Sequence, residues 1–263
     1  MKLSDAQHEA LADRLFAAVK AGVGIDPPSE TTDYGFEDAY RVRRKLVDRL
    51  IADGGKPRGH KIGFTSTAMQ EMYGMTGPDF GILLDTMFLP ANKPVMVTGK
   101  ANTRAEPELA FELARPLKGP GVTVEQAIAA CSKVYAAIEV IDSRVGAMRA
   151  KATDSLADNA GAGYVVLGDI ALDPGTIDYA AIEITQSVDG EHGAAPAADV
   201  MGHPAAPLAW LANKLPELSG LGGELAAGDI VITGSPVRSV AVQKGSRLTA
   251  TFGVLGTINL EFV

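Results

Sequence analysis

The spacing of apolar residues changes at Pro57, and this change limits the folds open to the chain. Before it, apolar side chains recur every three or four residues, which predicts two helices. After it, short apolar runs are separated by glycine, proline and aspartate, which predicts many short strands. Strands in runs with helices gathered elsewhere favour an α+β fold over an alternating α/β sheet. We expect a helical N-terminal region over residues 1–60 and a β-rich domain over residues 61–263, which together form one functional unit.

The two N-terminal helices have recognisable ends. Ser4 followed by Gln7 has the spacing of a capping box, and the apolar repeat after it ends at Gly22. A second helix is predicted over about residues 36–52 and is closed by a pair of glycines. Together these helices are expected to form a cap on the β-rich domain.

The rest of the chain is predicted to be short strands with few helices. The helices are a short one near residues 69–73, one of about ten residues opened by the capping-box pair Thr123 and Gln126, and one over about residues 204–215. A loop is expected at residues 77–81 and a hairpin turn at Asp189-Gly190. The strands are expected at residues 59–65, 95–97, 104–113, 134–141, 164–168, 182–188, 229–233, 239–243, 247–252 and 257–263.

Charge limits the partners of the protein. The 263 residues include 24 lysines and arginines against 32 aspartates and glutamates, for a net charge of −8. This sign opposes attraction to phosphate backbones and anionic lipid, so we expect no nucleic-acid and no membrane partner. No apolar run approaches the roughly eighteen residues of a membrane span, and acids interrupt the first residues where a signal peptide would be apolar. We therefore expect a cytoplasmic protein.

Sulfur and histidine chemistry are also limited. A single cysteine, Cys131, excludes an intramolecular disulfide and a multi-cysteine zinc site. The four histidines show none of the spacings that bind zinc. The chemistry of the protein must therefore come from oxygen and nitrogen groups.

Two carboxylates share one face of the strand predicted over residues 104–113. Alternate side chains of a strand point the same way, so Glu106 and Glu108 lie side by side, about 7 Å apart at Cα, with Arg104 on the same face. Carboxylates this close repel each other unless a cation lies between them. The alternative is a strand face that is acidic because it is solvated.

A third carboxylate, Glu139, lies in the middle of an apolar strand. Burying it is costly unless it is paired or bound to a metal, so Glu139 requires a partner. Asp142 competes with it, but an odd separation puts the two acids on opposite faces. Three carboxylates from Glu106, Glu108 and Glu139 would suit Mg²⁺ or Mn²⁺ rather than zinc. The alternative for Glu139 is an ion pair with Arg104 or Arg144.

Lys61 and Asp79 form a further candidate pair. Lys61 lies in a short predicted strand, and Asp79 lies in a predicted loop flanked by glycines that would bring its side chain near a ligand. A half-buried lysine beside a bound anion can hold or relay a proton, and a nearby aspartate can orient water or act as a base. The alternatives are a simple ion pair for Lys61 and a turn cap for Asp79.

Several segments occur in an order typical of one enzyme family. They are GHKIGFTS, GPDFGILLDTMF, RAEPELAF, GPGVT, EVIDSR, ADNA, GHPAAPLAWLANKL and DIVITGS. With them the chain resembles, from about Phe36 to Val263, the hydratase and decarboxylase branch of the fumarylacetoacetate hydrolase superfamily, most closely the 2-oxopent-4-enoate hydratases. The resemblance implies a mixed β-sheet roll of that superfamily's C-terminal-domain type, a divalent metal and a homo-oligomer.

The resemblance also implies roles for individual residues. Glu106, Glu108 and Glu139 match the metal ligands of the family, which favours Glu139 over Asp142, and Lys61 and Asp79 match its proton-transfer residues. The residues implied to meet the substrate are Thr65, Ser66 and Ser235. Arg104 is a candidate for the same role because an anionic substrate on an acidic protein needs local positive charge.

The implied reaction adds water to a 2-hydroxy-2,4-dienoate in the meta-cleavage catabolism of aromatic compounds. The product is a 4-hydroxy-2-oxo acid. Two alternatives stay open: decarboxylation of a 2-oxohex-3-enedioate (4-oxalocrotonate), and hydration of a longer 2-oxo-diacid of the 2-oxohept-3-enedioate type. The intact PDFG segment at residues 78–81 favours the hydratase.

Overall fold

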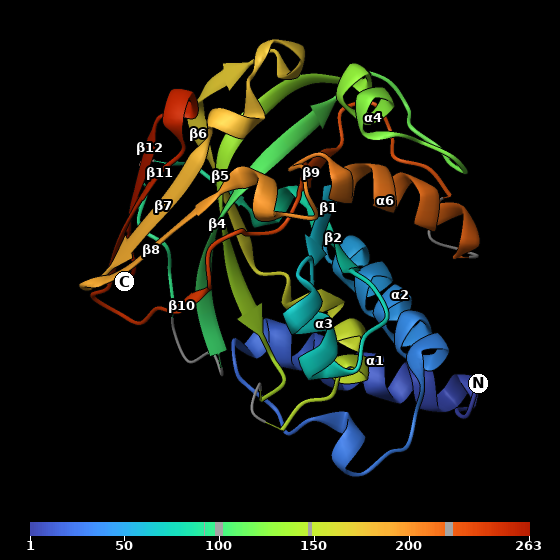
Figure 1. The fold of residues 1–263 in the computed structure, drawn as a ribbon. Coiled ribbons are helices and arrows are strands. Elements are labelled where there is room, and N and C mark those ends of the chain that lie inside the picture. The colour runs from blue at the N-terminus through green and yellow to red at the C-terminus, as the bar shows by residue number, and fades with distance from the viewer. Residues whose placement is uncertain (92, 98–101, 147–148, 219–222) are drawn as a thin grey trace.

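The computed structural model describes residues 1–91, 93–97, 102–146, 149–218 and 223–263, which form two β-sheets and a helical part (Figure 1). The helices are α1 (Asp5–Ala21), α2 (Phe36–Ala52), α3 (Thr67–Tyr73), α4 (Val124–Ala130), α5 (Ala152–Ala157) and α6 (Ala206–Lys214). The strands are β1 (Pro57–Gly63), β2 (Asp79–Leu84), β3 (Phe88–Leu89), β4 (Asn102–Leu113), β5 (Cys131–Ser143), β6 (Tyr164–Leu172), β7 (Glu183–Val188), β8 (Glu191–Pro196), β9 (Ile230–Ile232), β10 (Val240–Ala241), β11 (Arg247–Thr251) and β12 (Thr257–Glu261).

The larger sheet is mixed. Its strands run in the order β2-β1-β9-β4-β5-β6-β3, with β10 paired to β4, and the β1–β9 and β3–β6 pairs are parallel while the others are antiparallel. The smaller sheet is antiparallel, in the order β12-β11-β7-β8. Most strand pairs are antiparallel, rather than parallel pairs joined by regularly alternating helices, so the predicted α+β class is confirmed.

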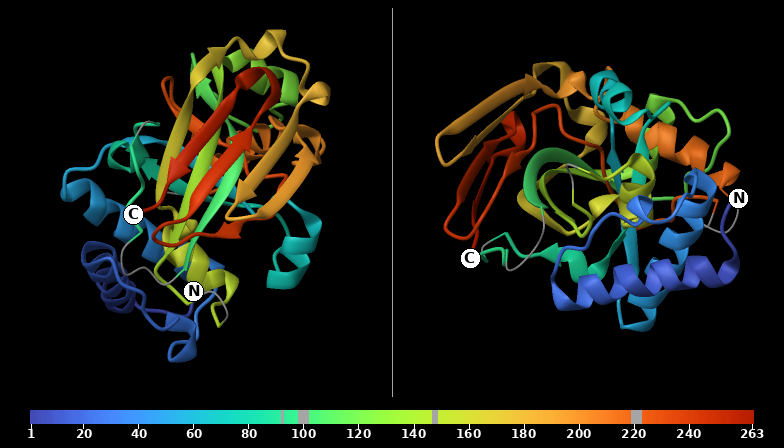
Figure 2. Two further views of the ribbon diagram at one scale, coloured as in Figure 1. Left: turned by 90° about the vertical axis from the view of Figure 1, so that its left-hand side faces the viewer. Right: turned by 90° about the horizontal axis from the view of Figure 1, so that it is seen from below.

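The main core lies between the two sheets, which Figure 2 shows stacked face to face. Leu109 and Phe111 of β4 belong to it, together with Leu248 of β11 and Ile258 of β12. These two β4 residues have the parity opposite to Glu106 and Glu108, as the alternation along the strand predicts. The acids of β4 therefore lie on the face of the large sheet that is turned away from the small sheet.

The N-terminal helices form a second core with part of the β-rich domain. The capping box of Ser4 and Gln7 is present, and α2 begins and ends where the sequence predicts. Leu15 of α1 and Leu46 of α2 pack with Leu156 of α5. The strand β1 begins at Pro57, inside the region expected to be helical, so the division at residue 60 stays a prediction.

Some local expectations are wrong. Residues 79–81 were expected in a loop, but they begin β2, because they pair with residues 61–63 of β1. The helix after Thr123 has seven residues rather than ten, since the chain turns directly into β5. The helix α5 was not expected at all.

Over the part of the chain that the structure describes, the helices are too short or too polar to cross a membrane.

Candidate metal centre

Three carboxylates meet where β4 pairs with β5. The antiparallel register places Glu106 directly opposite Glu139, and Glu108 follows two residues along β4 on the same face. One carboxylate oxygen from each residue lies within 4.8 Å of the others. Glu108 is 0% exposed, so the interpretation of the β4 face as solvated is wrong for this residue, while Glu106 is half-buried. Glu139 on β5 is 1% exposed.

The cluster lacks the positive charge that three converging carboxylates, two of them buried, require. The Gly234 N–H donates to Glu108 Oε2 at 2.6 Å, but Glu108 Oε1 and Glu139 Oε2 have no hydrogen-bond partner among the described residues. Burial and the charge of Glu139 raise the pKa of Glu106, and burial raises the pKa of Glu108 well above its usual value. Oxygen atoms that are buried, unpartnered and convergent form a donor set that fits a hard divalent cation.

Lys61 is the ion-pair partner of Glu139. Its Nζ lies 3.0 Å from Glu139 Oε1, and both side chains are buried. The expected alternatives for Glu139 are wrong, because Arg144 pairs with Asp158 at 2.8 Å and Arg104 donates to Ser239. Burial lowers the pKa of Lys61, but the surrounding glutamates raise it more, so the ammonium stays charged. One lysine still leaves the three carboxylates with a net negative charge.

The backbone around Lys61 is shaped to hold it. Lys61 Nζ donates to the Ala160 carbonyl oxygen at 3.1 Å. Asn159, Ala160 and Gly161 have φ values of 55°, 55° and 66°, a left-handed run that is unfavourable for alanine. The Asn159 side chain fixes this turn by donating to the Ile82 carbonyl and accepting from the Ile82 N–H, both at 2.8 Å.

Gly81 leaves room for the Lys61 stem. It lies opposite Lys61 in the β1–β2 register. A Cβ at position 81 would be 2.5 Å from the Asn159 carbonyl oxygen and 3.1 Å from Lys61 Cδ. Glycine is therefore required at position 81 for β2, Lys61 and the left-handed turn to approach one another.

Asp79 is completely buried beside an arginine that the sequence analysis missed. Arg43 Nη1 of α2 lies 3.5 Å from Asp79 Oδ1, and both side chains are 0% exposed. Asp79 Oδ2 has no hydrogen-bond partner among the described residues. Burial raises the pKa of Asp79 above its usual value, and the charges of Arg43 and Lys61 offset that rise only in part. The signal for Arg43 is its spacing, because Tyr40 and Val47 put position 43 on the apolar face of α2.

The residues predicted to meet the substrate occupy different positions. Thr65 lies against Gly234, because a Cβ at position 234 would be 2.7 Å from Thr65 Oγ1. Thr65 is therefore next to the residue whose N–H binds the Glu108 carboxylate. Ser235 follows Gly234, and its Oγ accepts from the Val237 N–H at 3.1 Å.

Two other predicted substrate contacts have partners within the protein. The exposed Ser66 caps α3 by accepting from the Met69 N–H at 3.3 Å. The guanidinium of Arg104 donates to the Ser239 hydroxyl at 2.7 Å, and its charge lowers the pKa of Glu106. The roles of all four residues toward a substrate stay predictions.

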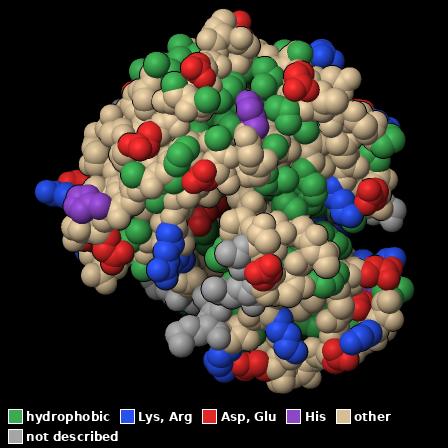
Figure 3. Space-filling view, in the orientation of Figure 1, with side chains coloured by type: hydrophobic (Ala, Val, Ile, Leu, Met, Phe, Trp, Pro, Cys, Tyr) green, Lys and Arg blue, Asp and Glu red, His purple; other side chains and the backbone are tan. Residues whose placement is uncertain are grey.

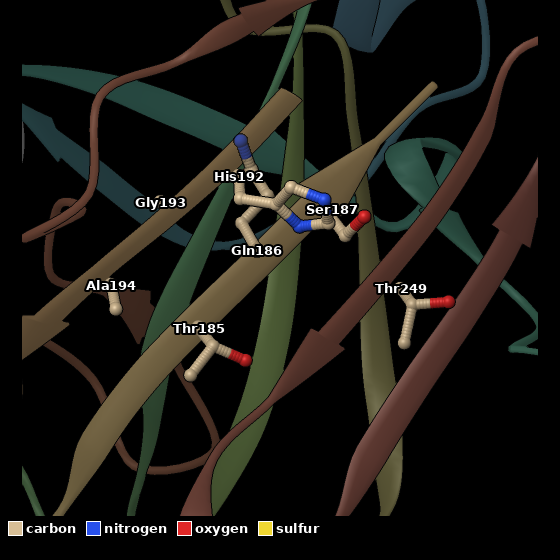
Figure 4. Close-up of a pocket in the computed structure, with 7 residues that line it drawn as sticks. All are labelled: Thr185, Gln186, Ser187, His192, Gly193, Ala194 and Thr249. Atoms are coloured by element: carbon tan, nitrogen blue, oxygen red, sulfur yellow. The ribbon is translucent and has the colours of Figure 1, made fainter. Parts of the chain in front are cut away.

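A hollow opens on the face that carries the cluster. Figure 3 shows it between the sheets and the helical part, with acidic side-chain atoms inside it. A separate, shallow depression of about 340 Å³ lies on the small sheet, among neutral side chains such as Thr185, Ser187 and Thr249 (Figure 4). None of the predicted site residues lines that depression.

Comparison with known proteins assigns the family. The model of the family described as fumarylacetoacetate (FAA) hydrolase C-terminal matches residues 65–263. The chain belongs to this family. The 2-oxo-hept-4-ene-1,7-dioate hydratase of Escherichia coli is 37% identical over 270 residues, which cover 97% of this chain and 98% of the relative. The 2-hydroxypent-2,4-dienoate hydratase of Pseudomonas putida is 38% identical and covers 78% of this chain and 94% of its own length.

A solved structure of this fumarylacetoacetate hydrolase family matches the whole fold. The 4-oxalocrotonate decarboxylase from Pseudomonas putida G7, complexed with magnesium and adipate, is 29% identical with a TM-score of 0.93, over 99% of both chains. The expectation of a sheet roll with N-terminal helices is confirmed. The family model begins at residue 65, so Lys61 and Arg43 come from the part of the chain before it.

Proposed function

We propose that this protein is a metal-dependent hydratase, a hydro-lyase that adds water to a 2-hydroxy-2,4-dienoate of the 2-oxopent-4-enoate type. The product is a 4-hydroxy-2-oxo acid in the meta-cleavage catabolism of aromatic compounds. The observation that carries the proposal is the convergence of Glu106, Glu108 and Glu139, the last two of them buried, with Lys61 paired to Glu139. Relatives at 37% and 38% identity that are named hydratases of such acids support the same reaction.

Glu106, Glu108 and Glu139 would hold Mg²⁺ or Mn²⁺, because their converging oxygens match the preference of these ions for carboxylates. When bound, such a cation supplies positive charge that stabilises the negative charge developing on the 2-oxygen of the substrate. The Gly234 N–H orients the Glu108 carboxylate through its hydrogen bond to Oε2. Lys61 orients Glu139 in the same way.

Lys61 and Asp79 would move the protons. The 2-hydroxyl proton leaves and C5 gains a proton, which gives a 2-oxo-3-enoate, and water then adds at C4 while C3 gains a proton. The charged Lys61 ammonium, fixed by Ala160 and Glu139, can hold a proton next to the 2-oxygen. Asp79 Oδ2, buried and without a partner, is suited to take a proton from the attacking water.

Thr65, Ser66, Ser235 and Arg104 would contact the substrate. Thr65 lies against Gly234 and Ser235 follows it, beside Glu108, so their hydroxyls would be available to a substrate held at the cluster. Arg104 shares the strand face of Glu106 and adds positive charge for an anionic ligand. Ser66 follows Thr65 directly at the start of α3.

Two other reactions would use the same centre. The decarboxylase that matches this fold at a TM-score of 0.93 supports decarboxylation of 4-oxalocrotonate as one alternative. The Escherichia coli relative supports hydration of a seven-carbon diacid as the other. Carbon dioxide release from 4-oxalocrotonate and the relative kcat/KM for five-carbon and seven-carbon substrates distinguish the three reactions.

The decisive experiment removes a single ligand charge at a time. Glu106→Gln and Glu108→Gln keep the shape of the side chains but weaken binding of a divalent cation, so hydration of 2-hydroxypenta-2,4-dienoate in Mg²⁺ should fall by about 100-fold or more. Glu191→Gln, on the exposed end of β8, is the matched control and should keep full activity. Full activity of both site variants in chelator-treated buffer would contradict the metal-centred mechanism.

We also infer a homo-oligomer in the cytoplasm. The single cysteine is consistent with a reducing compartment. Light scattering on the purified protein would give the subunit number, and a monomeric mass at micromolar concentration would contradict the oligomer.

A further inference from the structure

Arg43 is a charged side chain in an otherwise apolar environment. It is 0% exposed, and its guanidinium carbon lies 4.7 Å from the Tyr40 ring centroid and 4.1 Å from that of Phe80. Nη1 donates to the Phe80 carbonyl and lies 3.5 Å from Asp79 Oδ1. Nε and Nη2 have no hydrogen-bond partner among the described residues. The two rings hold the guanidinium plane, and Asp79 is the carboxylate that it meets.

Packing alone does not account for an arginine at this position. A buried guanidinium with two unpartnered nitrogens is unfavourable, and an apolar side chain of similar length would fill the same space without that penalty. Buried charges of this kind, paired with one specific partner, are frequent at functional sites. Its partner here is Asp79, which is itself completely buried and has one oxygen free.

The charges around Asp79 single out Arg43 as its own counter-ion. Lys61 on β1 also acts on Asp79, but its ammonium lies in an ion pair with Glu139 of the carboxylate cluster. From α2, Arg43 and Tyr40 face Asp79, and Tyr40 is neutral. The turn that packs on β2 presents the neutral Asn159. His60, the neighbour of Lys61, faces Arg43, and burial lowers its pKa to about 4, so it is neutral above that pH.

We propose that Arg43 is a positioning residue for the hydratase reaction: as the counter-ion it favours the ionised form of Asp79, and it fixes Oδ1 so that Oδ2 is aimed at the attacking water. This inference rests on the proposed function, because it takes Asp79 as the base. It assigns α2, which lies outside the matched family region, a part in the chemistry. Arg43 acts through Asp79 and touches no substrate atom.

The test measures the charge of Asp79 and the pH dependence of turnover in the magnesium-saturated protein. In Arg43→Met, Asp79 loses its counter-ion, so the acidic limb of the kcat/KM profile should move up by about one pH unit or more. At pH 7 kcat should fall by about 10-fold to 100-fold, while KM changes less than about threefold. In Arg43→Lys, which keeps the charge, the limb should stay in place. Arg44→Met, which removes an exposed arginine of the same helix, is the matched control and should behave as wild type.

Infrared difference spectra give a second measurement that needs no turnover. The spectrum of Asp79→Asn is subtracted from that of wild type, and the spectrum of the double variant is subtracted from that of Arg43→Met. Each difference isolates the bands of the Asp79 carboxyl group, which should be ionised at pH 7 in wild type and protonated in Arg43→Met. An Arg43→Met protein with an unmoved limb and an ionised Asp79 would overturn the proposal. If wild type hydrates no dienoate, the proposed function fails, and the spectra still decide whether Arg43 sets the charge of Asp79.

If Arg43→Met does not fold, a double-mutant cycle of Arg43→Lys and Asp79→Asn tests whether Arg43 acts through Asp79. A residue that acts through Asp79 gives coupled effects, so Arg43→Lys should change kcat in wild type and leave it unchanged in the Asp79→Asn background. Additive effects on kcat would overturn the proposal. Thermal unfolding of the four proteins accompanies the cycle and shows that each is folded at the assay temperature.

Discussion

At the scale of single residues, the site depends on how each buried charge is compensated. Glu139 could be recognised from the sequence because a carboxylate in an apolar strand needs a partner. The identity of that partner could not, since Lys61 lies about eighty residues away along the chain and reaches Glu139 only after β1 joins the sheet through β9. The parity of β4 gave the remaining two carboxylates without any tertiary information.

Ala160 gives a prediction at the same scale. Its left-handed φ of 55° aims the carbonyl oxygen at Lys61 Nζ. Ala160→Gly removes the steric cost of that conformation and should leave kcat within about twofold of wild type. Ala160→Val, whose branched side chain disfavours the conformation more strongly, should lower the unfolding free energy by about 2 kcal/mol and kcat by about tenfold. Thermal unfolding and steady-state hydration measure both, and a Val variant as active and stable as wild type would contradict this role.

At the scale of helices and strands, regular segments could be predicted and irregular ones could not. The capping box of Ser4 and Gln7 with an apolar repeat gave α1, an apolar repeat closed by glycines gave α2, and alternation gave β4 and β5. Asp79 was expected in a loop because glycine and proline surround it, but pairing with β1 outweighs that local preference. Arg43 could not be recognised from the sequence, because an arginine on the apolar face of a helix only interrupts the repeat of apolar residues, and its partner Asp79 is not evident before the fold is known.

The packing of β2 against β1 and the left-handed turn leads to a prediction about Gly81. Gly81→Ala would put a Cβ 2.5 Å from the Asn159 carbonyl oxygen, which is backbone and cannot rotate away. We expect the unfolding free energy to fall by about 1–3 kcal/mol, as for other overpacked sites, and kcat to fall with the displacement of Lys61. Gly77→Ala is the control, because a Cβ there has no atom within 4 Å. Equal stability and activity of the two alanine variants would show that the close approach is unimportant.

At the scale of the whole molecule, the acidic side chains of the surface and those of the carboxylate cluster have different effects on stability. The net charge of −8 counts mostly exposed side chains, many of them paired across α1 and α2, as Glu9 is with Lys45 and Arg49. Exposed pairs of this kind contribute little to stability. The clustered acids of β4 and β5 do affect stability: without a cation, their burial and mutual repulsion destabilise the folded state.

Because the clustered carboxylates destabilise the fold when they are ionised, the stabilisation by Mg²⁺ should depend on pH. The pKa of Glu106 rises from an ordinary value to about 7 in the folded, metal-free protein, and that of Glu108 rises as well. An acid with a raised pKa binds its proton on folding, so this stabilisation is complete below the unfolded pKa and is lost as the pH rises through about 7. A divalent cation replaces the proton and binds better as the carboxylates ionise. The gain in Tm from Mg²⁺ over chelator should therefore grow between pH 6 and pH 8.

The expected size of this gain follows from mass action. At a Mg²⁺ concentration of about 100 times Kd the folded state gains about 2.7 kcal/mol, which corresponds to a Tm increase on the order of 5 °C for a chain of this length. The partly buried His60 also titrates, with its pKa lowered to about 4, but it contributes equally with and without metal and cancels in the difference. In Glu106→Gln one titrating ligand is gone, so the gain should be smaller at every pH and should rise less steeply between pH 6 and pH 8. A Mg²⁺ gain that is independent of pH, or that is undiminished in Glu106→Gln, would contradict a metal centre built on these carboxylates.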